Sequence, residues 1–332
     1  MRGSAFTERA MIERLARLFD SGTGTGAAVV ERGIGDDAAV LRFGRRRLVW
    51  TVDVCVEGVH FDLRWLSLQD VGWRSLQAAA SDIAAMGAIP LGALSSLVVP
   101  AKVADKQIPE LARGQAEAAR AQGFPMVGGN LSRGSELSVT TAVLGQTNRP
   151  LYRSGARPGD QVWLVGEVGL SAMGLELLKS APQRRSARRR AWSSAERACI
   201  QAWRRPRALL REATSLVRCA RAVIDVSDGL GGDAGELARA SRVRLVLDEK
   251  LMRDALPSEL ISVCRRRNID PLHIALRGGE DYALLVAGPA HRKPPVARVI
   301  GHVTRGSGVR LLGLDGKMKR VGSSFDHFSS RG

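Results

Sequence analysis

RLVWTVDV, at residues 47–54, alternates apolar and polar side chains as a half-buried strand does. The next stretch, LQDVGWRSLQAAASDIAAMG at residues 68–87, repeats its apolar residues at helical spacing. LGALSSLVV, at residues 91–99, has the composition of a second, more buried strand. A strand, a helix and a strand in succession predict a mixed α and β domain in which the helix packs on a sheet.

The flanking sequence extends this pattern in both directions. Near the middle of the chain, this pattern of strands and helices is interrupted by Pro150, Gly155, Pro158 and Gly159. We therefore expect an α+β protein with two α/β-sandwich-type domains, residues 1–148 and 149–332, each with helices on one face of its sheet. Further helices are predicted at the N-terminus as far as Phe19 and over residues 105–122, 170–179 and 232–241, and further strands over 137–145, 161–166, 221–226, 245–248, 282–287 and 296–303.

The composition excludes several classes of protein. A chain of 332 residues, 45% of them hydrophobic, is long enough to bury a sizeable core. Its apolar stretches are shorter than the roughly 20 residues that a membrane-spanning helix needs, and its charged first residues lack a secretory h-region. The cysteines lie far apart without C-x-x-C spacing, which excludes a disulfide framework or zinc finger and favours reduced thiols in a cytoplasmic protein. They are Cys55, Cys199, Cys219 and Cys264.

The net charge of +17 is concentrated in one segment. Residues 183–221 contain 12 Arg and 2 Glu, which is +10 of that total. Such a run indicates either a nucleic-acid footprint or a solvated helical face. Trp192 and Trp203 lie within it, but it carries no known nucleic-acid motif, so we favour the solvated face over a nucleic-acid partner. A basic surface also attracts anionic small molecules.

Aspartates beside glycines, at predicted strand ends or helix starts, are the strongest chemical signal. Carboxylates in such positions suit a hard cation such as Mg²⁺, which takes oxygen ligands and is usually held together with substrate phosphates. Backbone N–H groups freed in glycine-rich turns can cradle those phosphates. The residues are Asp36 and Asp37 in GIGDD, Asp53 in TVD, Asp82 in SDIAAMGA, and Asp225 and Asp228 in IDVSDGL.

Each of these motifs also has a purely structural interpretation. An Asp-Asp pair after glycine is typical of a turn, Ser81-Asp82 of a helix cap, and Gly128-Gly129 of a tight turn. His60 is equally typical of a buried or interface histidine. The recurrence of several such motifs in one chain favours a shared site over independent coincidences.

The ordered set of motifs closely resembles the thiamine-monophosphate kinases, within the superfamily of aminoimidazole ribonucleotide synthetase. The resemblance spans residues 8–328, and GGEDY with the terminal FDHF distinguishes this family from its relatives. The chain lacks the C-terminal cysteine of the hydrogenase-maturation relatives. The motifs are GIGDDAAVL (33–41), TVDVCVEGVHF (51–61), SDIAAMGAIP (81–90), VGGNLSRG (127–134), SGARPGD (154–160), IDVSDGL (224–230), GGEDY (278–282) and FDHF (325–328).

The resemblance implies an activity and a set of site residues. The activity is transfer of the ATP γ-phosphate to thiamine monophosphate with several Mg²⁺ ions, in a homodimer whose N-terminal sheets join into a barrel-like core. The acceptor phosphate is already anionic, so no general base is required and the repulsion between two anions is the main obstacle. Metal ligands fall on Asp37, Thr51, Asp53, Asp82, Asn130, Asp225 and Asp228, nucleotide contacts on Gly129, Asn130, Arg153 and Ser227, and thiamine contacts on His60, Glu280 and Phe325.

Two positions depart from the family pattern. Asn130 stands where the family usually has the Asp of G-G-D, and an amide oxygen is a weaker, uncharged ligand. Val52 removes a hydroxyl from the usual S-T-D. We interpret the chain as an active kinase. The alternatives are a superfamily relative that acts on another small acceptor, and a basic nucleic-acid-binding protein that kept the fold.

Overall fold

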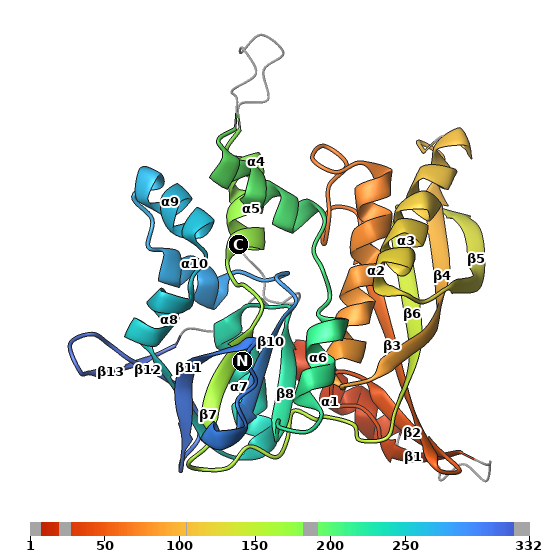
Figure 1. Cartoon of the computed structure of the whole chain (residues 1–332). Helices are drawn as coiled ribbons and strands as arrows, with labels where there is room; N and C mark the ends of the chain where they lie inside the picture. The colour runs from red at the N-terminus through yellow and green to blue at the C-terminus, as the bar shows by residue number, and fades with distance from the viewer. Residues whose placement is uncertain (1–7, 20–27, 104, 182–191, 322–332) are drawn as a thin grey trace, which may run out of the picture.

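Two mixed sheets with their helices lie side by side in the computed structural model, which describes residues 8–19, 28–103, 105–181 and 192–321 (Figure 1). The first half of the chain forms a six-stranded sheet in the order β1-β2-β3-β6-β4-β5. The second half forms a seven-stranded sheet in the order β13-β12-β9-β11-β7-β10-β8. The expected mixed architecture with two sheets is confirmed.

The first sheet is antiparallel except where β4 pairs with β5. The strand β5 was not expected, and the tight-turn interpretation of Gly128-Gly129 is wrong. A Cβ at residue 129 would lie 1.8 Å from the carbonyl oxygen of Ser95, so only glycine lets β5 approach β4 this closely. The elements are α1 (Glu8–Phe19), β1 (Ala28–Arg32), β2 (Ala39–Phe43), β3 (Arg46–Val56), α2 (Leu68–Ala85), β4 (Ile89–Pro100), η1 (Asp105–Gln107), α3 (Ile108–Gln122), β5 (Met126–Gly134) and β6 (Ser138–Thr147).

One face of the first sheet is covered by helices, as expected. Strand β3 shows this by alternation, since Val49 and Thr51 are buried whereas Trp50 and Val52 are more than half exposed. The helix α2 packs against β3 and β6 on the buried side. The opposite face is apolar, and no helix of the described residues covers it.

The second sheet is antiparallel except for the parallel pair β9 and β12. The sequence patterns missed β12, β13 and α8 to α10, all short elements. The bounds are β7 (Gln161–Val165), α4 (Leu170–Lys179), α5 (Ser194–Arg204), α6 (Leu210–Leu216), β8 (Ala222–Val226), α7 (Leu230–Ser241), β9 (Arg244–Asp248), α8 (Glu249–Ala255), α9 (Ser258–Arg267), α10 (Pro271–Arg277), β10 (Ala283–Gly288), η2 (Ala290–Arg292), β11 (Ala297–Thr304), β12 (Gly308–Leu312) and β13 (Met318–Arg320).

The strands β10 and β8, at one end of the second sheet, are buried on both faces, so the expectation of helices on one face is wrong here. Every residue of β8 and of β10 is buried. Ile224 belongs to the core cluster that includes α4, α5 and α7, whereas Val223 belongs to the cluster that includes α2 and α6. The helix α2 thus packs between the two sheets and contacts β3, β6 and β8 (Figure 1). This shared helix brings residues from the two halves of the chain together.

Several expectations concern features that a single chain does not test. The first sheet is open, with β1 and β5 at its edges, so the expected barrel-like core of a homodimer stays a prediction. The division at residues 148 and 149 also stays a prediction.

The four cysteines are free and buried. Among the described residues, none of the helices combines the length and apolarity needed to cross a bilayer.

Candidate active site

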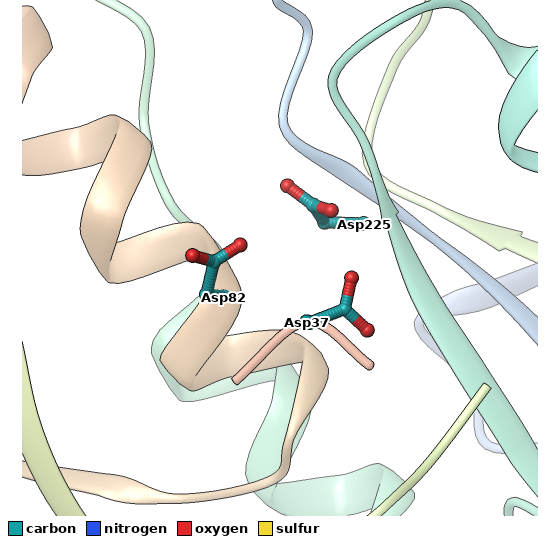
Figure 2. Close-up of side chains that lie close together, drawn as sticks. All are labelled: Asp37, Asp82 and Asp225. Carbon is teal, nitrogen blue, oxygen red and sulfur yellow. The ribbon is translucent and has the colours of Figure 1, made fainter. Parts of the chain in front are cut away.

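Three carboxylates from distant parts of the chain converge where α2 meets β8 (Figure 2). One oxygen each of Asp37, Asp82 and Asp225 lies within 4.8 Å of the other two. Asp37 precedes β2, Asp82 is in the last turn of α2, and Asp225 is on β8. The helix-cap interpretation of Ser81-Asp82 is therefore wrong, because Ser67 caps α2 instead. We refer to Asp37, Asp82 and Asp225 as the carboxylate cluster.

Hydrogen bonds orient each carboxylate of the cluster. Thr51 Oγ1 donates to Asp82 Oδ2 at 2.5 Å, and Ser81 Oγ donates to Asp225 Oδ2 at 2.8 Å. The guanidinium of Arg153 donates to Asp37 Oδ1 from Nε at 3.1 Å and from Nη2 at 2.7 Å. Asp37 Oδ2 is buried and has no hydrogen-bond partner. The cluster therefore contains at least one oxygen available to a ligand.

The electrostatics of the cluster favour a bound cation. Burial and the charge of Asp37 raise the pKa of Asp225 to about 8. Burial, with the charges of Asp225 and Asp53, raises the pKa of Asp82 well above its usual range. Oxygen donors with mutually repelling charges and an unpartnered buried oxygen fit a hard divalent cation such as Mg²⁺.

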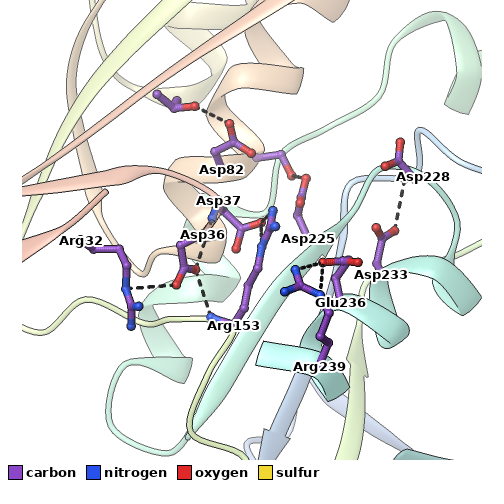
Figure 3. A network of polar contacts seen from close by, with 12 residues as sticks. Arg32, Asp36, Asp37, Asp82, Arg153, Asp225, Asp228, Asp233, Glu236 and Arg239 are labelled. Atoms are coloured by element: carbon purple, nitrogen blue, oxygen red, sulfur yellow. Dashed lines mark hydrogen bonds and ion pairs between the residues drawn. The ribbon is translucent and has the colours of Figure 1, made fainter. Parts of the chain in front are cut away.

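Two more of the expected metal ligands lie next to the cluster. Asp53, half-buried on β3, is close enough for its charge to raise the pKa of Asp82. Asp228, in the loop after β8, contributes in the same way to the raised pKa of Asp225. The backbone N–H of Asp228 donates to Asp233 Oδ2 at 3.2 Å, which ties this loop to the first turn of α7 (Figure 3). Of the five aspartates that the resemblance implied as ligands, three form the cluster, and the charges of Asp53 and Asp228 act on it.

A second group of polar contacts holds Arg153 in place (Figure 3). The backbone N–H of Arg153 donates to Asp36 Oδ1 at 3.0 Å, and Arg32 pairs with Asp36 Oδ2 at 3.5 Å. Burial and the adjacent charge of Asp37 raise the pKa of Asp36 to about 6. The two aspartates of the GIGDD motif therefore have different roles: Asp36 holds the backbone of Arg153, and Asp37 contacts its side chain.

The nucleotide contacts named from the sequence lie in two places. Gly129 and Asn130 line a cavity of about 420 Å³ between α3 and the strands β4 and β5. The buried amide of Gln115 also lines this cavity, and its Nε2 donates to Ser95 Oγ at 2.8 Å. Ser227 lies instead after β8, where its carbonyl oxygen accepts from the N–H of Glu280 at 2.7 Å. Arg153 and Ser227 are near the carboxylate cluster, whereas Asn130 lies on β5 at the cavity.

Two of the three expected thiamine contacts are in the described chain. His60 is half-buried in the turn after β3, and its Nδ1 accepts from the N–H of Val56 at 3.1 Å. Glu280 lies in the loop before β10 and forms an ion pair with Arg74 of α2. Phe325 lies outside the described residues.

The side chain of Val52 points away from the carboxylate cluster. It is 64% exposed on the uncovered face of the first sheet, whereas Thr51 and its hydrogen-bond acceptor Asp82 lie on the helix-covered face. A hydroxyl at residue 52 would therefore lie across the sheet from these side chains.

Several arginines of the basic segment form ion pairs with other elements. Arg205 pairs with Asp70 at 2.9 Å and with Glu117 at 3.2 Å, and Arg221 pairs with Asp160 at 2.5 Å. Residues 183–191 of the segment lie outside the described chain. The described part of the segment thus has structural contacts within the molecule.

The sequence interpretation missed three polar side chains that support the site. Ser81 orients Asp225, Asp233 holds the loop of Asp228, and Arg74 pairs with Glu280. Ser81 directly precedes Asp82, and the spacing of seven residues between Arg74 and Ser81 puts both on one side of α2. Polar residues on the inward side of a buried helix were the available signal.

Comparison with known proteins agrees with this geometry. The family model of the AIR synthase related protein N-terminal domain matches residues 35–147, and that of its C-terminal domain matches residues 157–313. The thiamine-monophosphate kinase of Aquifex aeolicus is 36% identical over 283 residues, 84% of this chain and 89% of that protein. The enzyme of the same name from Mycobacterium tuberculosis is 34% identical over 93% of this chain and 88% of its own length.

A solved structure supports the same relationship. The structure of AaThiL complexed with AMPPCP and TMP superimposes with a TM-score of 0.86 at 32% identity, covering 98% of this chain and 99% of that one. Both family models, the full-length relatives and this structural match agree with the order of motifs along the chain. The chain belongs to the thiamine-monophosphate kinase family of the AIR synthase related proteins.

Proposed function

We propose that this protein is a Mg²⁺-dependent kinase that transfers the γ-phosphate of ATP to thiamine monophosphate, giving thiamine diphosphate and ADP. The carboxylate cluster is the observation that carries the proposal, because it gathers oxygen donors from three distant segments into one buried site. The family membership supports the substrate pair, since a relative of similar fold was solved with AMPPCP and TMP.

Mg²⁺ would be held by Asp37, Asp53, Asp82, Asp225 and Asp228, with Thr51 as a further oxygen donor. Asn130 is proposed as an oxygen donor to a metal ion held with the nucleotide at the cavity. Bound Mg²⁺ supplies neutralisation of the negative charge on the two phosphates that must meet. The carboxylates serve as ligands and accept no proton, because the attacking phosphate oxygen is deprotonated at neutral pH. Direct in-line transfer without a general base follows from this chemistry.

The remaining residues bind and orient the two substrates. Arg153 presents a forked donor, suited to a phosphate group, and its attachment to Asp36 and Asp37 fixes it at the cluster. The cavity beside Gly129 and Asn130, lined with Leu97, Ala112 and Leu131, suits the flat, largely apolar base of the nucleotide. His60, Glu280 and Phe325 are proposed to contact the thiamine portion, whose thiazolium ring is cationic.

We also propose that the protein is a homodimer joined through the uncovered face of the first sheet. The exposed fraction is between 46% and 64% for Trp50 and Val52 on β3 and for Leu94 on β4. The register places Val52 and Leu94 on either side of Ala142, so they form one continuous face. A contiguous apolar surface of this kind is typical of a protein-protein interface.

The direct test is product formation. The purified protein with ATP, Mg²⁺ and thiamine monophosphate is expected to form thiamine diphosphate and ADP in equal amounts, measured by chromatography, and EDTA is expected to abolish the reaction. Asp225→Asn should lower kcat by about 100-fold or more, because removing an electrostatic ligand costs several kcal/mol of transition-state stabilisation. Absence of product with the parent protein would reject the proposal.

Two controls separate loss of the site from loss of the fold. Asp225→Asn keeps an acceptor for Ser81 and removes a buried repulsive charge, so without Mg²⁺ the variant should unfold at or above the temperature of the parent. Asp254→Asn alters an exposed carboxylate that pairs with Lys250, and should keep full activity. ADP release with other phosphate acceptors but none with thiamine monophosphate would favour the superfamily relative with another acceptor.

A further inference from the structure

Arg74 is a buried charged residue to which the proposed reaction assigns no role. Its side chain is 4% exposed, on the side of α2 that faces the second half of the chain. Its Nη1 donates to the carbonyl oxygen of Trp203, and its guanidinium carbon lies 5.0 Å from the centroid of the Trp203 ring. Its Nη2 forms the ion pair with Glu280. A guanidinium buried this deeply is tolerated only when it is paired.

The exposure of the two charges differs. The side chain of Glu280 is 28% exposed, against 4% for that of Arg74, so the carboxylate lies between the guanidinium and solvent. Arg74 is thus too covered to meet a substrate, whereas part of Glu280 is open to one. Glu280 is thus the partner through which Arg74 can act on a substrate.

The loop of Glu280 needs such support. Glu280 has φ +64° and Tyr282 has φ +52°. Both lie in the left-handed region of backbone conformation, which residues other than glycine adopt at an energetic cost. The N–H of Glu280 donates to the carbonyl oxygen of Ser227 at 2.7 Å, and the N–H of Tyr282 donates to the carbonyl oxygen of Val226 at 2.9 Å. These hydrogen bonds hold the loop against the end of β8. Arg74 fastens the side chain of Glu280 to α2. These two attachments connect Glu280 to the elements that carry Asp225 and Asp82.

We propose that Arg74 is a positioning residue for the acceptor: it holds the Glu280 carboxylate in one orientation, so that Glu280 acts as a directed contact for the thiamine portion. The inference rests on the proposed function for the identity of the acceptor. Because Arg74 compensates the charge of Glu280, recognition depends on where the carboxylate points more than on its net charge. Lysine is a poor substitute, because an ammonium lacks the planar fork that bonds Trp203 and Glu280 together.

The test compares the two substrates in steady-state kinetics. Arg74→Met is expected to raise KM for thiamine monophosphate about tenfold or more while KM for ATP changes less than about twofold. Arg74→Lys should give an intermediate value. Glu280→Gln should raise the same KM, and the double variant should be no worse than the more impaired single variant, as expected for residues that act together.

Arg64 offers a matched control. It also pairs with a carboxylate, Asp62, and lies 4.8 Å from the ring of Trp65, but its side chain is 62% exposed. Arg64→Met should leave both KM values unchanged. An equal rise of both KM values in Arg74→Met, or an unchanged KM for thiamine monophosphate, would overturn the inference. If Arg74→Met does not fold, Arg74→Lys serves for the same comparison.

A second measurement is independent of activity. In thermal unfolding, the effects of Arg74→Lys and Glu280→Gln should be non-additive by about 2 °C or more if the two side chains interact. Additive effects would reject the inference whether or not the protein is a kinase. A parent protein that forms no thiamine diphosphate, with coupling still present, would reject the proposed function and retain Arg74 as the residue that holds Glu280.

Discussion

At the residue scale, Asp281 has a role that the GGEDY motif alone does not reveal. Its carboxylate accepts hydrogen bonds from the N–H groups of Gly169 at 2.6 Å and Ser171 at 3.0 Å, which begin the helix α4. Gly169 has φ +90° and no side chain of its own to cap the helix. An aspartate more than 100 residues further along the chain therefore satisfies the free N–H groups of α4.

This residue predicts a pH dependence of stability. Burial raises the pKa of Asp281 to about 7, from an ordinary value of 3.8. Between these two pH values the folded state therefore binds more protons than the unfolded state. The contribution of Asp281 to the free energy of unfolding is fully present below about pH 4 and is lost as the pH rises through 7. Relative to Asp281→Asn, the unfolding free energy of the parent should fall with pH by up to about 1.4 kcal/mol per unit.

Denaturant titrations of both proteins between pH 5 and 8 measure this difference. If the parent instead gains stability over the variant as pH rises, the N-terminus of α4 holds the carboxylate as an anion more strongly than burial opposes it. In that case the pKa of Asp281 lies below 3.8 in the folded protein.

At the element scale, glycines set the distance between α2 and α3. A Cβ at Gly72 would lie 2.0 Å from the carbonyl oxygen of Leu111, and one at Gly114 would lie 1.9 Å from that of Gln69. The two helices thus cross backbone to backbone at these positions. Since Gln115 of α3 lines the proposed nucleotide cavity, the same contact positions that cavity.

Gly114→Ala is therefore expected to destabilise the protein. Alanine is normally favoured over glycine within a helix by about 1 kcal/mol, but overpacking costs about 1–3 kcal/mol or more and acts here on backbone that cannot rotate away. The net loss should be at least about 1 kcal/mol in chemical denaturation. Gly235→Ala in α7 is the matched control, because no atom lies within 4 Å of its added Cβ, and it should stabilise the protein. Equal effects at both positions would contradict the close helix crossing.

At the scale of the whole molecule, the two sheets differ in what covers them. The second sheet is enclosed by its own helices on one side and by α2 and α6 on the other. The first sheet has α2 and α3 on one face only, and its other face carries exposed Trp50, Val52 and Leu94. A second copy of the chain on this face would cover it.

Leu94→Glu is expected to separate the dimer. A charge in the middle of an apolar interface is costly to desolvate, so the mass in analytical ultracentrifugation should fall from about twice 35.7 kDa to 35.7 kDa. Leu314→Glu changes a residue that is 67% exposed in the second half of the chain and should leave the parent mass unchanged. A parent protein that sediments as a monomer at micromolar concentration rules out the dimer.

Local patterns predicted much of this molecule. The alternation of β3, the helical periodicity of α2 and the composition of β4 and β6 indicated their type, because each reports which side of a single element is buried. The strand β5 was missed, because its glycines and exposed side chains resemble a loop, and it exists through pairing with β4. The helices α8 and α10, of seven residues each, have too few turns for their periodicity to be read, whereas α9 was missed although it is as long as α4.

The amino-acid sequence by itself determined the family, the carboxylates available as ligands and the order of the main elements, since motifs and periodicity are properties of consecutive residues. Only the tertiary structure decided that Asp37, Asp82 and Asp225 meet, that Arg74 pairs with Glu280, and that α2 covers both sheets. The carboxylate cluster and the Arg74–Glu280 pair join residues more than 40 positions apart, and such contacts arise when apolar surfaces of different elements bury one another. No local propensity of either partner encodes such a meeting.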